Sequence, residues 1–216
     1  MIDASDDEVV RQSFFLLTQI PIAARADDFP KALRRVGIAV GDDPGLVELC
    51  SAMMSAVDRF ISSKGVRTDY GEIAQLAVVE SVYRLIGREL SDLFDTDRRL
   101  KMTLSSFAEP RHFAVLAREF FARLTRRHLD FYLSRELASH VGTDQYFPSL
   151  AEHEDFETAL DLHCREATRI IKEFSADWFY KHTVEDGIDR ELAGRFVHVA
   201  AGKIRDELVR RDTAHA

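Results

Sequence analysis

Glycine and proline are scarce in this chain, with ten glycines and five prolines among 216 residues. In average proteins the two together make up about 12% of residues. Their shortage excludes collagen-like and linker-rich chains, and it argues against disorder. Because both residues interrupt helices, it also favours a helical protein. A chain of this length buries enough surface to fold without an external staple.

Cysteine is rarer still, since Cys50 and Cys164 are the only two. Each lies among apolar neighbours at helical spacing, which predicts buried, reduced thiols. Small secreted domains that depend on disulfides carry many more cysteines, so two reduced thiols are favoured over a disulfide framework. Reduced thiols fit the cytoplasm.

The sequence also lacks an export signal and a membrane span. Its amino end carries Asp3, Asp6, Asp7 and Glu8, whereas a secretory signal needs positive charge before an apolar run. The uncharged stretch 12–24 is shorter than the roughly 20 residues that cross a bilayer. We therefore expect a cytoplasmic protein with no membrane partner.

Common catalytic motifs are missing as well. The chain has no glycine-rich phosphate loop, no Gly-x-Ser-x-Gly, no His-Glu-x-x-His and no paired Cys-x-x-Cys. No cofactor and no reaction are predicted on this basis. An enzyme assembled from dispersed residues stays open.

Helix boundaries and apolar periodicity together predict an all-α fold. Apolar residues recur every three or four positions, and no alternating strand pattern occurs. The expected helices span 5–20, 29–36, 44–64, 69–94, 106–141, 150–182 and 188–211, with a further short helix around 96–104 left open. We expect a compact bundle of about seven helices in a single domain, 1–216. The two long helices, 106–141 and 150–182, should pack antiparallel, and a subdivision near 142–148 is the alternative.

The helix expected over 69–94 has a broad apolar arc and one polar side. That side holds Glu80, Ser81, Arg84, Arg88 and Asp92. A wide apolar arc is typical of a helix covered by several neighbours, so we expect this helix to be central.

Charge is unevenly distributed along the chain. The whole protein carries a net charge of −8, yet residues 97–136 hold nine basic residues against five acidic ones. Within that segment Arg111, Arg118 and Arg126 share one helical side, and Arg98 and Arg99 lie just before them. Such a row could meet phosphates, which makes a nucleic-acid-binding regulatory protein one alternative. The negative net charge opposes it, and a solvated helix face explains the same row.

Two histidines, His128 and His163, interrupt apolar rows. If their helices pack together, the imidazoles could share a metal or a proton, with Asp161 or Glu166 as a carboxylate. An enzyme or metal-binding protein centred on these histidines is the second alternative. A lone histidine on an apolar stripe is more often a core residue with one hydrogen bond, and this is the stronger explanation of both, so no metal ligand is assigned.

Adjacent aromatic residues point about 100° apart on a helix, so both can be buried only if two sides are covered. Trp178, Phe179 and Tyr180 form such a group and are the best candidates for an interface.

Arginine outnumbers lysine by 23 to 6, a hint of a GC-rich coding sequence. We therefore expect an interaction or adaptor protein of the bacterial cytoplasm, which binds a protein partner or forms a homo-oligomer.

Overall fold

The computed structural model describes residues 5–65, 67–90, 97–137, 150–185 and 187–214. Over these ranges the chain is all-α, as the sequence predicts, and no strand occurs. The helices are α2 (Glu8–Ala24), α3 (Phe29–Arg35), α4 (Leu46–Lys64), α5 (Asp69–Glu89), α6 (Asp97–Ser106), α7 (Pro110–Leu137), α8 (Leu150–Ala167), α9 (Arg169–Val184) and α10 (Arg190–Ala214). In the described part, no helix is long and apolar enough to cross a membrane.

Local capping explains where several helices begin and end. The Asp7 carboxylate accepts hydrogen bonds from the backbone amides of Val9 and Val10, at 2.7 and 3.1 Å, and so starts α2. The hydroxyl of Thr68 does the same for α5 by accepting from the amide of Gly71. Gly65 ends α4 in the left-handed conformation, with φ of 67°.

The helix expected over 69–94 is α5, and it packs against α2, α4, α6 and α7, but α2 has more helical neighbours. The helix α2 packs against α3, α4, α5, α6, α7 and α10. The Phe14 ring lies at the centre and stacks on Phe196 of α10 at 4.9 Å. Phe113 of α7 stacks on Phe179 of α9 at 3.8 Å. These rings belong to one hydrophobic cluster that joins the amino-terminal helices to α7, α9 and α10.

The long helix expected over 150–182 is in fact two helices, α8 and α9. This is one reason why the described residues form more helices than the seven expected. Thr168 lies between α8 and α9, and its hydroxyl donates to the carbonyls of Cys164 and Arg165 at 2.9 and 3.1 Å. Side-chain hydrogen bonds of this kind compete with the backbone ladder and bend helices. The amide of Ile171 then bonds the Thr168 carbonyl, a tighter turn than the α-helical one.

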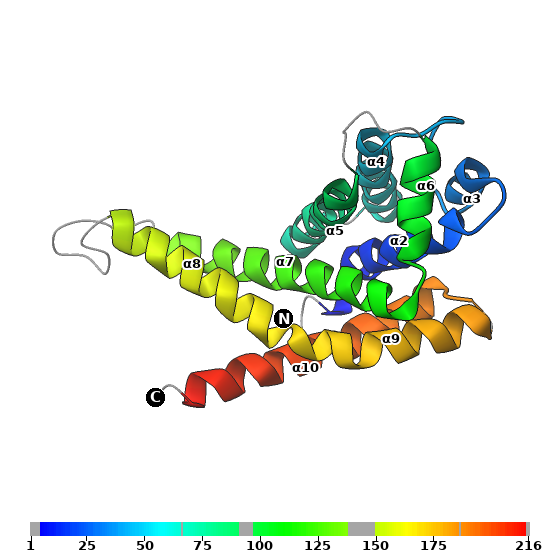
Figure 1. Cartoon of the computed structure of the whole chain (residues 1–216). Coiled ribbons are helices and arrows are strands. Elements are labelled where there is room, and N and C mark those ends of the chain that lie inside the picture. The colour runs from blue at the N-terminus through cyan, green and yellow to red at the C-terminus, as the bar shows by residue number, and fades with distance from the viewer. Residues whose placement is uncertain (1–4, 66, 91–96, 138–149, 186, 215–216) are drawn as a thin grey trace.

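The helices α8 and α9 return antiparallel along α7, as expected (Figure 1). Contacts across the pair run in opposite chain directions: Phe113 meets Phe179, Glu119 meets Arg165, and Arg126 meets Glu157. Figure 1 also shows α3–α6 on one side of α7 and α8 and α9 on the other, whereas α10 packs directly against α2. The subdivision considered near 142–148 lies outside the described residues.

Candidate functional site

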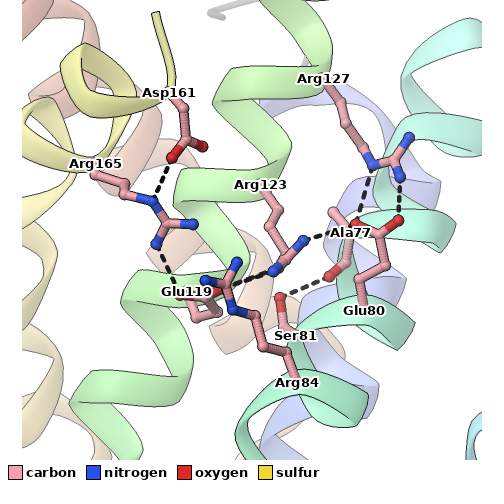
Figure 2. A network of polar contacts seen from close by, with 9 residues as sticks. All are labelled: Ala77, Glu80, Ser81, Arg84, Glu119, Arg123, Arg127, Asp161 and Arg165. Atoms are coloured by element: carbon pink, nitrogen blue, oxygen red, sulfur yellow. Dashed lines mark hydrogen bonds and ion pairs between the residues drawn. The ribbon is translucent and has the colours of Figure 1, made fainter. Parts of the chain in front are cut away.

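An arginine-lined cleft lies where α5, α7 and α8 meet. Its volume is about 390 Å³. We call it the arginine cleft, and its charged lining consists of Arg84, Arg123, Arg126, Arg127 and Arg165 with Glu80, Asp130 and Asp161. Figure 2 shows most of these side chains converging from the three helices.

On the α5 side, the carboxylate of Glu80 holds two arginines of α7. Arg123 Nη1 donates to Glu80 Oε2 at 2.9 Å, and Arg127 Nη2 donates to the other oxygen, Oε1. The guanidinium groups of Arg123 and Arg127 therefore already bind a carboxylate, that of Glu80 in the same chain.

The carboxylate of Glu119 lies between the three helices and is only 12% exposed. It accepts from Arg123 at 3.0 Å and from Arg165 of α8 at 3.4 Å, and Arg84 of α5 lies 3.9 Å away. One buried carboxylate thus links α5, α7 and α8 (Figure 2).

The α8 side of the cleft is also ion-paired. Arg165 Nε donates to Asp161 at 2.7 Å, and this hydrogen bond raises the pKa of the Arg165 guanidinium. Arg126 of α7 pairs with Asp130 on its own helix and with Glu157 on α8. Guanidinium groups stay charged and present a planar fork of donors, so the arrangement suits recognition of carboxylates or phosphates.

A second hollow, the α5 groove, adjoins the arginine cleft and has a volume of about 540 Å³. It shares Glu80, Arg84 and Arg123 with the cleft. Its remaining lining is Val79, Tyr83, Gly87 and Arg88. An apolar surface therefore continues directly from the cationic one.

The arginines that the sequence suggested for nucleic acid do not form one exposed row. Arg126 lines the cleft, whereas Arg118 is half-buried and donates to the Arg165 carbonyl at 2.8 Å. Arg111 and Arg99 are exposed on α7 and α6. The side chain of Arg98 lies outside the described residues.

The two singled-out histidines occupy different environments. His128 is 7% exposed and packs between Tyr70 at 5.3 Å and Tyr132 at 4.9 Å. His163 is half-buried on α8. Over the described ranges, no group of three His, Cys, Asp or Glu side chains could hold a metal ion.

Of the three aromatic residues suggested as an interface, only Tyr180 has an exposed side chain. Phe179 is 1% exposed and belongs to the core, so it offers no surface for a partner. Trp178 is half-buried, with its ring 4.4 Å from that of Phe196. Tyr180 is 60% exposed. The second covered side that adjacent aromatics require is supplied here by the chain itself.

Sequence reasoning missed most of the cleft. Arg123, Arg127 and Arg165 are not among the residues that the sequence pattern singles out. The polar side of α5 was the available signal, because Glu80, Arg84 and Arg88 all line the cleft or its groove. Ser81 on that side is instead buried and donates to the Ala77 carbonyl, and Asp92 lies outside the described residues.

Comparison with known proteins gives no further guide to function, because no family model, no curated protein and no solved structure matches the chain.

Proposed function

We propose that this protein is a non-catalytic interaction protein that binds an acidic segment of a partner protein in the arginine cleft. The observation that carries the proposal is the convergence of five arginines from three helices on one cleft. Their ion-pair partners are carboxylates of the chain itself, so a partner's carboxylate would bind by exchange with one of them. Clustered guanidinium groups in a protein of net charge −8 favour a short anionic ligand, because the net charge repels long polyanions.

The same reasoning places nucleic acid second. A duplex offers many phosphates in a row and is held by cations spread along its length. Arg99, Arg111 and Arg118 do not line the cleft and do not extend it into such a path. A protein segment with a few carboxylates needs only the cleft.

The proposal is tested by fluorescence anisotropy with a labelled hexaglutamate peptide at low ionic strength. Arg84→Gln and Arg127→Gln each remove one cleft cation, and we expect either change to weaken binding at least fivefold. Arg111→Gln is the matched control, since Arg111 is exposed on α7 and does not line the cleft. Added salt should weaken binding further, because these ion pairs are partly exposed.

Three results would contradict the proposal. The first is no peptide binding at low salt, and the second is an equal loss in the Arg111→Gln control. The third is tighter binding of a labelled DNA duplex with a steep salt dependence, which would favour the nucleic-acid alternative. Light scattering on the same samples separates a foreign partner from self-association, since only the latter raises the mass of the protein alone.

A further inference from the structure

The α5 groove is built from two neighbouring rows of one helix. Val79, Tyr83 and Gly87 follow each other at intervals of four, and so do the charged residues Glu80, Arg84 and Arg88. Residues four apart lie on the same helical face, so the rows run side by side. From Val79 to Arg88 the helix rises about 13 Å, which is about four residues of extended chain.

Gly87 is the unexpected member of the apolar row. Glycine is unfavourable inside a helix, second only to proline. Its φ is not positive, and a Cβ at this position would meet only Leu46 Cδ2 at an ordinary 3.6 Å. Neither the backbone nor the packing of α5 therefore requires glycine here. What the missing side chain does provide is open space in the groove.

The groove and the cleft share Glu80, Arg84 and Arg123, so one ligand can occupy both. Tyr83 is 46% exposed at the groove and offers an aromatic face to an incoming side chain. An anionic group in the cleft would then be adjacent to an apolar group in the groove.

We propose that the cleft and the groove together bind a short partner segment in which an acidic residue neighbours an aromatic or large aliphatic residue. This inference rests on the proposed function and specifies its ligand. The guanidinium groups of Arg123 and Arg127, which already bind the Glu80 carboxylate, select the acidic residue, and the space beside Tyr83 and Gly87 selects the apolar one. The partner's carboxylate would replace that of Glu80 on Arg123 and Arg127.

The experiment compares two labelled peptides, Glu-Glu-Phe-Glu-Glu-Phe and hexaglutamate, by fluorescence anisotropy. We expect the phenylalanine peptide to bind at least tenfold more tightly. Gly87→Leu fills the groove and should remove this advantage while leaving hexaglutamate binding unchanged. Gly87→Ala, which adds one methyl group, is the matched control and should keep most of the advantage.

Tyr83→Ala provides a second test that does not depend on how Gly87→Leu folds, because Tyr83 is an exposed side chain. It should lower the affinity for the phenylalanine peptide at least threefold and spare hexaglutamate. Equal affinity of the native protein for both peptides would overturn this inference and leave the proposed function standing. Failure of both peptides to bind would overturn the two together.

Discussion

Glu119 of α7 and Arg165 of α8 form an ion pair of 3.4 Å at a point where the carboxylate is nearly buried. The Glu119 carboxylate also accepts a hydrogen bond from Arg123. Neutralising Glu119 therefore removes the anion that Arg123 and Arg165 share. Loss of one member of a buried ion pair is costly because the other charge stays desolvated.

Glu119→Gln should therefore lower the free energy of unfolding by about 2 kcal/mol, a partly buried case between the exposed and the fully buried limits. Urea denaturation followed by circular dichroism measures the change. Glu191→Gln is the control, because the Glu191–Arg195 pair is exposed and has the same (i,i+4) spacing as the Glu119–Arg123 pair. That control should cost less than about 0.5 kcal/mol. Similar losses in both variants would contradict the central role of Glu119.

Phe179 and Tyr180 are neighbours with opposite environments, and substitution should separate them. Phe179→Ala removes a ring stacked on Phe113 in the core and should cost about 3–5 kcal/mol of unfolding free energy. Tyr180→Ala removes an exposed ring and should change it by less than about 0.5 kcal/mol. Thermal melts of the two variants suffice. A large loss for Tyr180→Ala would mean that this ring is covered in solution.

Replacing glycine by alanine should have opposite effects on stability at Gly202 and at Gly71. At Gly202, inside α10, a Cβ meets nothing within 4 Å, so Gly202→Ala should stabilise the protein by about 0.5–1 kcal/mol. At Gly71, in the first turn of α5, a Cβ would lie 3.0 Å from the Val9 Cβ and from the Thr68 hydroxyl. Gly71→Ala should destabilise by about 1–3 kcal/mol, since the helices must separate slightly. Denaturation midpoints of equal value would refute this contrast.

Because Cys50 and Cys164 are buried thiols, we expect the protein to lose stability at high pH. Burial raises the pKa of Cys50 to about 12 and that of Cys164 to about 11, from an ordinary value of 9.0. Above pH 9 the unfolded chain releases these protons and the folded chain keeps them, so unfolding becomes more favourable as pH rises. The effect is absent below pH 9 and reaches about 1.4 kcal/mol per thiol near pH 10.

Comparison with a Cys50→Ala, Cys164→Ala double variant isolates this contribution. The double variant should be less stable at neutral pH because it loses two buried side chains, and its unfolding free energy should fall less steeply between pH 9 and 10. Iodoacetamide labelling gives an independent check, because both thiols should react slowly in buffer and quickly in urea. Identical pH slopes in the two proteins would contradict the expectation.

The fold class follows from sequence because helical periodicity and capping are local signals. Phe156, Leu160, Ala167, Ile171, Phe174 and Trp178 keep one apolar row through Thr168, so periodicity alone continues the helix across the break. The break depends on what the Thr168 hydroxyl does, and a threonine inside a helix is otherwise unremarkable. Periodicity shows which face is apolar, but it does not show that the chain bends there.

The candidate site is a property of three helices and is not local. Arg123, Glu80 and Arg165 are ordinary surface-type residues in the sequence, and each becomes part of the cleft only because α5 and α8 pack on the two sides of α7. The row Arg111, Arg118 and Arg126 was correct as a spacing, yet α8 covers part of it, so Arg118 bonds a carbonyl of α8. Helix pairing decides which charges meet.

The break at Thr168 divides one stretch of chain between two kinds of attachment. The helix α9 contributes Ile171 and Phe179 to the hydrophobic cluster. Among the described residues α8 contributes none to that cluster; it buries Cys164 and Ala167 and is tied to α7 by the ion pairs of Arg126 and Glu119. Ionic strength consequently affects the attachment of α8 and that of α9 differently. Added sulfate screens the ion pairs between α7 and α8 and strengthens the apolar packing of α9, so hydrogen exchange in the two helices should diverge as this salt is added.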